Sequence, residues 1–250
     1  MRTPPLAAIL LLTALLAGKP AEAAASTTPA CPAPIELAAP DAHAGALPRV
    51  AAALRMGTLD VLAVGSGTML GPRGRAEGSF ADQMAQDLRA ALPGVEIRLV
   101  VQGERGMTAA AMVSVMDHEL DRHHFDLIVW QTGTVEAVRK LPPDEFARTL
   151  DAGAALARQQ SADLVLVDPQ FSRMLQAKAD LTPYRAIMQD ATRRNGIVLF
   201  HRFGLIRTWV DAGALDLEKA PRRDRSETTA ELNTCLGQAL AKVVLRAANR

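Results

Sequence analysis

Five short apolar runs alternate along this chain with segments of helical spacing, and this alternation limits the fold more than any other feature. Each run is rich in Val, Ile and Leu, and several lack polar alternation, as expected of strands buried on both faces of a parallel sheet. The predicted strands are Leu59–Gly65, Val95–Val101, Phe125–Gln131, Ala162–Asp168 and Gly196–His201. Alternating strands and helices predict a three-layer α/β/α sandwich with a five-stranded parallel sheet in the order 2-1-3-4-5.

Local capping signals mark where the intervening helices begin and end. Thr182 followed by Pro183 opens the segment before the fifth strand, and Gly196 closes it. A Thr-x-x-Glu capping box at Thr228 and Glu231 predicts the start of the last helix. The other predicted helices are Ser79–Leu92, Met107–His124 and Pro143–Gln160.

The first residues have the three parts of a secretory signal peptide. Arg2 supplies the positive charge, Leu6–Ala17 is an unbroken apolar run, and Ala21-Glu22-Ala23 has the small-x-small pattern of a cleavage site. A transmembrane anchor needs about 20 apolar residues, so this run is too short. We therefore expect residues 1–23 to be removed from an exported protein, periplasmic or secreted. Residues 24–45 would then form an Ala/Pro-rich arm and residues 46–250 one domain.

The net charge and the cysteine content indicate which binding partners and which cellular compartment to expect. The formal net charge is +1, which gives no electrostatic reason to bind nucleic acid. Cys31 and Cys235 are an even pair that an oxidising compartment tends to bridge, although two buried thiols are the alternative. No segment after the signal peptide is long and apolar enough for a transmembrane anchor, and we expect a monomer.

In a parallel sheet of this kind the ligand site lies beyond the carboxyl ends of the strands. The residues that follow the predicted strands are therefore the first candidates for a functional site. These are residues 65–68, 102–104, 132–135, 168–170 and 201–202.

The order of these segments resembles that of the SGNH/GDSL hydrolases. The resemblance runs from Leu59 to Leu245 and is strongest in VWQTGT from Val129, in HRFGLIRTWV after the fifth strand and in CLGQALA from Cys235. It implies a flavodoxin-like SGNH hydrolase fold. In that family a nucleophilic Ser follows the first strand, a Gly and an Asn after the next two complete an oxyanion hole, and an Asp-x-x-His pair precedes the last helix.

The resemblance assigns two of the five family roles to matching residues and three to substituted ones. Gly103 fits the glycine of the second segment, and Asp224 fits the Asp of the Asp-x-x-His pair. Gly67 stands at the Ser position, Val135 at the Asn position and Glu227 at the His position. The oxyanion-hole region would consist of Gly67, Gly103, Thr134 and Val135.

Each substitution has a chemical consequence. Without a hydroxyl at Gly67 no acyl-enzyme can form there. The Val135 side chain has no N–H to donate, and one missing oxyanion donor costs about 2.7–4 kcal/mol of transition-state stabilisation. Glu227 cannot pass on a proton as an imidazolium does, and beside Asp224 it adds repulsion between carboxylates.

Nearby side chains offer replacements for the missing groups. Ser66 or Thr68 could serve as a nucleophile one residue away from the family position. Adjacent residues at a strand end point to opposite sides, and this would direct the Ser66 hydroxyl away from the site. His201 ends the fifth strand at the correct edge, but a surface histidine beside Arg202 is the simpler interpretation. A solvated helix end, rather than a metal site, is the simpler interpretation of His118, Asp121, His123 and His124.

Three classes of function remain. We favour an exported, catalytically degenerate member of the fold that acts as a binding or scaffold protein in the cell envelope, with a small molecule or glycan as its ligand. The alternative is an active hydrolase of acyl or acetyl esters of carbohydrate or lipid that uses Ser66 or Thr68. The third is a structural envelope protein without a ligand. In none of these do we expect a metal or another cofactor.

Overall fold

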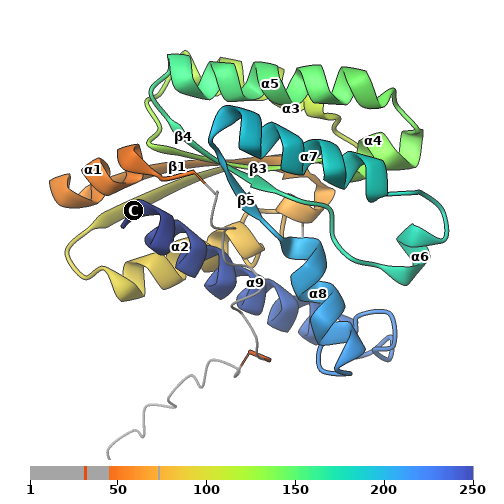
Figure 1. Cartoon of the computed structure of the whole chain (residues 1–250). Helices are drawn as coiled ribbons and strands as arrows, with labels where there is room; N and C mark the ends of the chain where they lie inside the picture. The colour runs from red at the N-terminus through yellow and green to blue at the C-terminus, as the bar shows by residue number, and fades with distance from the viewer. Residues whose placement is uncertain (1–30, 33–44, 73, 250) are drawn as a thin grey trace, which may run out of the picture.

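The computed structural model describes residues 31–32, 45–72 and 74–249. A five-stranded parallel sheet, in the order β2-β1-β3-β4-β5, lies between two groups of helices (Figure 1). The predicted sandwich and strand order are confirmed. The strands are β1 (Thr58–Ser66), β2 (Glu96–Glu104), β3 (Leu127–Gln131), β4 (Asp163–Val167) and β5 (Val198–Phe200).

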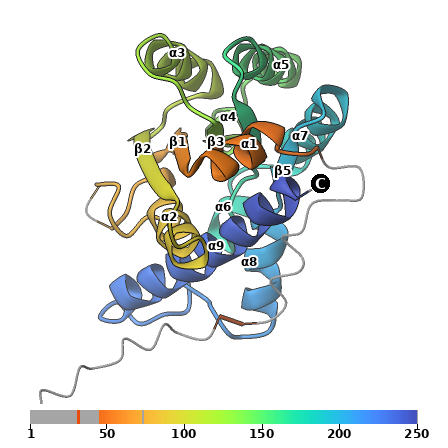
Figure 2. The ribbon, with the colours of Figure 1, turned by 90° about the vertical axis from the view of Figure 1, so that its left-hand side faces the viewer.

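The helices form two layers, one on each face of the sheet (Figure 2). One layer holds α3 (Ala109–Leu120), α5 (Pro143–Gln159) and α7 (Thr182–Asn195). The other holds α2 (Phe80–Ala91), α8 (Arg202–Asp211) and α9 (Arg225–Ala248). The remaining helices are α1 (Pro48–Met56), which packs on β1 and α9, and the short η2 (Gly67–Met69), α4 (Thr134–Arg139) and α6 (Arg173–Gln176).

Alternate residues of a single strand supply two separate hydrophobic cores. Val61 and Ala63 of β1 belong to the core beneath α2 and α9, whereas Leu62 and Val64 belong to the core beneath α3 and α5. Because both faces of the strand are buried, the sequence needs apolar residues at every position. This explains why several of the strands lack polar alternation.

The helix ends agree with the local signals at α2 but not at α9. Ser79 caps α2, since its side chain accepts the backbone N–H of Asp82 at 3.1 Å. The capping box predicted at Thr228 is wrong, because α9 already begins at Arg225. Thr228 lies inside the helix, where its hydroxyl donates to the carbonyl of Asp224 at 3.0 Å.

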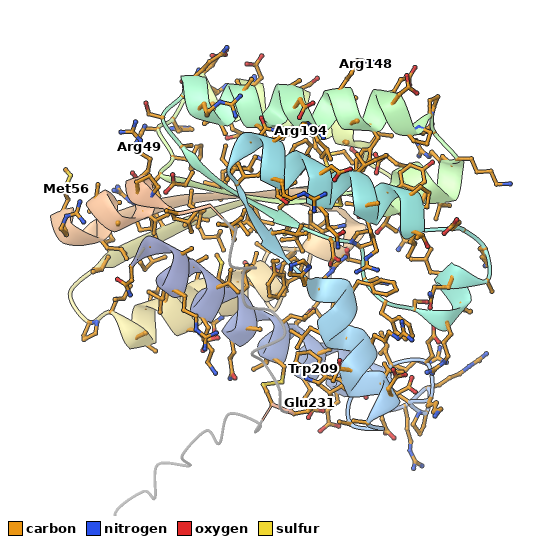
Figure 3. All side chains as sticks on the ribbon, in the orientation of Figure 1. Arg49, Met56, Arg148, Arg194, Trp209 and Glu231 are labelled. Atoms are coloured by element: carbon orange, nitrogen blue, oxygen red, sulfur yellow. A yellow bond between two sulfur atoms is a disulfide. The ribbon has the colours of Figure 1, made fainter. Side chains whose placement is uncertain are left out.

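Charged side chains cover the outer surface of the helical layer that contains α5 and α7. Arg148 of α5 and Arg194 of α7 lie on the outside of these helices (Figure 3). Arg194 pairs with Asp151 at 3.0 Å and so links the two helices. A solvated ion pair of this kind adds about 0.2–1 kcal/mol, so the buried cores hold the layers together.

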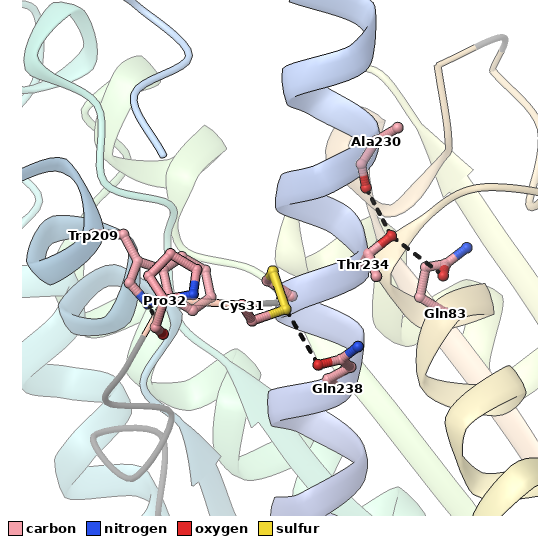
Figure 4. Close-up of a disulfide and its surroundings, with 8 residues drawn as sticks. Cys31, Pro32, Gln83, Trp209, Ala230, Thr234 and Gln238 are labelled. Atoms are coloured by element: carbon pink, nitrogen blue, oxygen red, sulfur yellow. Dashed lines mark hydrogen bonds between the residues drawn. A yellow bond between two sulfur atoms is a disulfide. The ribbon is translucent and has the colours of Figure 1, made fainter. Parts of the chain in front are cut away.

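A disulfide between Cys31 and Cys235 joins the beginning of the described chain to α9, as predicted (Figure 4). Beside it, Trp209 donates through Nε1 to the carbonyl oxygen of Pro32 at 2.9 Å. The signal peptide and most of the arm lie outside the described residues, so the boundaries at 23 and 45 stay predictions. Within the described ranges, no helix combines the length and the apolar character that a bilayer span requires.

Candidate functional site

The carboxyl ends of β1 and β3 bring two hydroxyl groups onto one amide oxygen. Ser66 donates through Oγ to Gln131 Oε1 at 3.4 Å, and Thr68 donates through Oγ1 to the same oxygen at 3.1 Å. Gln131 is 1% exposed and Ser66 is 7% exposed, whereas Thr68 lies at the surface. An amide oxygen accepts a hydrogen bond but does not remove a proton at neutral pH. Gln131 therefore cannot activate either hydroxyl as a nucleophile.

Arg202 lies beneath this pair of hydroxyls and ties the site to β4. Its side chain is 1% exposed, whereas the neighbouring His201, which we expected at the surface, is half-buried. Arg202 Nε donates to the backbone carbonyl oxygen of Asp168 at 3.2 Å, and Nη1 lies 3.5 Å from Thr68 Oγ1. Burial lowers the pKa of Arg202 to about 10, and the charge of Asp168 opposes this shift. The guanidinium is therefore still charged at neutral pH.

Asp168 is the buried carboxylate of the same site. Its Oδ1 accepts the backbone N–H of Phe203 at 2.7 Å, and its Oδ2 accepts Arg185 Nε at 3.2 Å. Burial raises the pKa of Asp168, while the Phe203 N–H bond and the nearby cations lower it. Asp168 thus contacts two arginines at the ends of β4 and β5: its carboxylate bonds Arg185, and its backbone carbonyl oxygen bonds Arg202.

Two buried nitrogen donors of this polar cluster lack a hydrogen-bond acceptor. Within the described residues, Gln131 Nε2 and Arg202 Nη2 have no hydrogen-bond partner. A buried donor without a partner costs about 1–3 kcal/mol. Such atoms are rare in folded proteins and often mark functional sites or ordered water. They identify the cluster of Ser66, Thr68, Gln131, Asp168 and Arg202 as the candidate site.

Gly67 occupies the first turn after β1 without a backbone reason to be glycine. Its φ is not positive, because Gly67 is absent from the glycines in the left-handed region. A Cβ built at this position would lie 3.4 Å from Arg105 Cα, which is an ordinary contact. The local fold would therefore accept a Ser at the position where the SGNH/GDSL hydrolases have one.

The groups expected to form an oxyanion hole are engaged elsewhere. Gly103 does not follow β2 as predicted but lies inside it, paired with Gly65. The side chain of Leu70 packs over Gly103, since Leu70 Cγ is 3.1 Å from the place a Cβ would occupy. The N–H of Gly133 donates to Glu136 Oε2 at 3.0 Å. This N–H is therefore already used within the turn after β3.

The next two residues, Thr134 and Val135, form the first turn of α4. Both are half-buried, and Thr134 Oγ1 has no hydrogen-bond partner among the described residues. The isopropyl side chain of Val135 offers neither a donor nor an acceptor to a ligand. The Thr134 hydroxyl is therefore the one side-chain donor at these two positions, and it is buried rather than open to a ligand.

Asp224 and Glu227 are on the polypeptide that leads into α9. The Asp224 carboxylate lies 3.4 Å from Arg223 Nε, and Glu227 is exposed in the first turn of the helix. Among the described hydrogen bonds and ion pairs, none joins either carboxylate to the polar cluster. The structure thus leaves Glu227 without the partner that a general base would need.

Gln131 and Glu136 lie outside the segments predicted to hold the site, and Asp168 lies in one of those segments but was assigned no role there. Gln131 and Asp168 each stand at the end of a buried apolar run, and a polar residue at that place was the available signal. Glu136 is buried, and its Oε1 accepts the N–H of Ala109 at 2.6 Å, so it fixes the start of α3 as well as the turn after β3. The Gly133-x-x-Glu136 spacing indicated this turn.

The histidines of α3 and of the turn after it stay outside the site. His118, His123 and His124 are exposed, and His124 Nε2 lies 3.3 Å from Asp126 Oδ1. No group of three His, Cys, Asp or Glu side chains within the described ranges is arranged to hold a metal ion.

Two cavities open near the carboxyl ends of β4 and β5. A cavity of about 650 Å³ lies between the end of α4 and the start of α7, and includes Arg185 and Phe203 in its wall. A second cavity of about 490 Å³ lies between α8 and the start of α9, with Phe171, Ile206 and Leu232 in its wall. Gly67, Val135 and Glu227 line neither of these two cavities.

Solved structures with the same architecture are esterases and lipases. A putative lipolytic protein of the G-D-S-L family from Desulfitobacterium hafniense superposes with a TM-score of 0.58 at 17% identity, over 75% of this chain and 99% of that chain. A variant of Axe2, an acetyl xylan esterase from Geobacillus stearothermophilus, has a TM-score of 0.58 at 14% identity, over 77% of this chain and 95% of that chain. A lipase/acylhydrolase from Enterococcus faecalis has a TM-score of 0.53 at 13% identity, over 70% and 94%. At these identities the likeness shows the fold.

The sheet order and the two helical layers agree with these structures and, together with the family match that follows, show an SGNH/GDSL-like domain. No curated protein matches the chain. The sequence model of the Non-GDSL lipase-like family matches residues 30–250, and the chain belongs to this family.

Proposed function

We propose that this protein is an exported, catalytically inactive relative of the SGNH/GDSL hydrolases that serves as a binding protein in the cell envelope. One observation carries the proposal. Gly67 stands at the nucleophile position, and the hydroxyls on either side of it both donate to the Gln131 amide oxygen. The place of the reaction in the family therefore has neither a nucleophile nor a base.

The remaining catalytic positions support the same conclusion. Val135 lies in the first turn of α4 and has no side-chain donor, and the Gly133 N–H is bonded to Glu136. Glu227 is exposed at the start of α9. A single loss is repaired more easily than three losses in separate parts of the chain.

A role in binding is favoured over a purely structural role because the molecule keeps open space at the carboxyl edge of the sheet. The cavity of about 650 Å³ is within the usual range for small-molecule sites, which is about 300–1,000 Å³. Export is supported by the pattern of residues 1–23 and by the Cys31–Cys235 disulfide, which suits an oxidising compartment.

An ester-hydrolysis assay separates this proposal from the alternative of an active hydrolase. The mature protein should release nitrophenol from short acyl nitrophenyl esters no faster than a boiled sample does. The variants Ser66→Ala and Thr68→Ala should leave this background unchanged. A rate above the boiled control that either variant abolishes would establish the shifted-nucleophile hydrolase instead.

The export part is tested by the N-terminus of the protein in its own cells. Recovery from the periplasm or the medium as a chain that begins at Ala24 is the expected result. Recovery of the full-length chain from the cytoplasm would contradict it.

A further inference from the structure

The cavity between α4 and α7 has the size and the lining of a small-molecule site. Its volume is about 650 Å³, and its wall is formed by the end of α4, by residues 176–185 and by Phe203 of α8. The apolar part of the wall includes Ala137, Leu181 and Phe203. The turn that holds Gly67 is not part of this wall, so the cavity is a separate site from the family's catalytic position.

Arg185 is held in the wall of this cavity by two contacts. Its Nε donates to Asp168 Oδ2 at 3.2 Å, and its guanidinium carbon lies 3.9 Å from the centre of the Phe203 ring. The ion pair and the stacking fix the plane of the guanidinium before a ligand arrives. Within the described residues, the bond to Asp168 is the only hydrogen bond of this side chain, so both Nη nitrogens keep their donors.

The remaining charges of the wall are mainly positive. Of the four lysines in the described ranges, Lys140 and Lys178 both line this cavity. Asp180 is the one carboxylate among its lining residues, and its Oδ1 accepts the N–H of Thr182 at 2.9 Å. That carboxylate is therefore directed to the start of α7 rather than to the lysines. The first turn of α7 lines the cavity as well and adds the partial positive charge of a helix N-terminus.

We propose that this cavity binds a small molecule through a carboxylate or phosphate group, with Arg185 as the anchor and Lys140 and Lys178 as further cations in the same wall. A fixed guanidinium matches the two oxygens of such a group and binds them bidentately. The apolar wall contacts the remainder of the ligand. The proposal holds whether or not the chain hydrolyses esters, so the failure of one proposal leaves the other standing.

Isothermal titration of the mature protein with three probes at constant ionic strength tests the proposal. The probes are inorganic phosphate, glucuronate and, as a neutral sugar of the same size, glucose. We expect saturable binding of at least one of the two anions and none of glucose. Binding of phosphate alone identifies a phosphate site, and binding of glucuronate alone identifies a carboxylate site.

Two variants locate the binding in this cavity. The exposed lysines permit the double change Lys140→Gln with Lys178→Gln without disturbing the core, and Arg185→Lys keeps the charge beside Asp168 but removes the two-pronged donor. Each should weaken anion binding about tenfold or more, the effect of losing one charge-assisted hydrogen bond. Lys242→Gln, at an exposed lysine of α9 that is outside the cavity wall, should leave the affinity unchanged.

Three results would overturn the proposal. The first is the absence of saturable binding for both anions. The second is equal affinity of the wild type and the double lysine variant, which would place the anion elsewhere. The third is binding of glucose as tight as that of glucuronate.

Discussion

Arg202 of α8 donates through Nε to the backbone carbonyl oxygen of Asp168 at 3.2 Å, and both side chains are almost completely buried, at 1% and 2% exposure. The bond joins the carboxyl end of β4 to the first residue of α8. Because β5 lies between these two segments in the sequence, the pair fixes the turn that leaves β5. The buried charges thus hold in place the strand ends on which the candidate site is built.

Removal of one charge from this pair should destabilise the fold strongly. In Asp168→Asn the buried Arg202 and the half-buried Arg185 lose their counter-charge, and the buried, uncompensated charge of Arg202 costs about 3–5 kcal/mol of unfolding free energy. The double variant Asp168→Asn with Arg202→Met should lose less than the sum of the two single losses, by about 0.5–3 kcal/mol. Urea unfolding of the four proteins measures this coupling. Strictly additive losses would show that the two side chains do not interact.

For Asp87 we predict that removing the charge stabilises the protein and that this gain depends on pH. Burial raises the pKa of Asp87, the charge of Lys242 opposes the shift, and Asp87 Oδ2 has no hydrogen-bond partner among the described residues. Because the pKa of Asp87 is higher in the folded state, its contribution to the unfolding free energy is complete below pH 3.8. This contribution is lost as the pH rises through the pKa of the folded state. Asp87→Asn cannot titrate, so its stability relative to the wild type should be higher at about pH 7 than at about pH 3.

Asp144 is the control for this experiment because its pKa moves the other way. The side-chain hydrogen bond from Arg148 lowers the pKa of Asp144. The stabilising contribution of Asp144 is therefore present above pH 3.8 and is lost as the pH falls through the pKa of the folded state. Asp144→Asn should therefore be slightly less stable than the wild type at neutral pH, and equal to it in acid. Unfolding curves in which both variants change in the same direction with pH would contradict the prediction.

Gly237 is where α9 comes closest to α2. A Cβ at this position would lie 2.4 Å from Gln83 Cβ and 2.7 Å from the backbone nitrogen of Met84. Gly237→Ala should therefore force the helices apart and lower the unfolding free energy by about 1–3 kcal/mol. At Gly204 of α8, no atom lies within 4 Å of the place that a Cβ would occupy. Gly204→Ala should therefore raise the unfolding free energy by about 0.4–1 kcal/mol. Thermal unfolding of the two variants compares these opposite effects of the same substitution.

The disulfide should contribute measurably to stability. Cys31 and Cys235 are separated by 204 residues, and a bridge that closes a loop of this length constrains the unfolded chain. Cys31→Ser with Cys235→Ser should lower the unfolding free energy by roughly 2–4 kcal/mol. Trp209 fluorescence should change as well, because Pro32 provides the acceptor for its indole N–H. A double serine variant as stable as the wild type would show that the bridge has no structural role.

The sheet was predictable from the sequence because β3, β4 and β5 and most of β1 are buried on both faces, and this burial requires apolar runs. The start of α1 was not predictable in the same way. Its first N–H groups are capped by Asp163, which accepts from Arg49 at 2.8 Å and from Val50 at 3.0 Å. A cap that lies more than a hundred residues away leaves no local pattern.

The sequence predicts a site beyond the carboxyl ends of the strands, and the buried polar cluster lies at this edge but contains residues to which the sequence assigned no role. Gly67 and Val135 could be assigned because the resemblance to the SGNH/GDSL hydrolases places the family's Ser and Asn at these positions. Arg202 is buried against Asp168, which is 34 residues away and directly follows β4, so the local sequence of Arg202 did not reveal its burial. At the start of α9 the predicted capping box at Thr228 misled, because the helix extends back to Arg225. Glu227 therefore lies on an exposed first turn of the helix.

The central claim is that the turn after β1 has no reactive nucleophile, and covalent labelling with a fluorophosphonate tests it most directly. Intact-mass measurement of the mature wild-type protein should show no added phosphonate. The variant Gly67→Ser with Val135→Asn and Glu227→His is the matched comparison, since a side chain at position 67 meets only ordinary contacts. A phosphonate adduct on the unmodified protein, mapped to Ser66 or Thr68, would contradict the account and identify an active hydrolase.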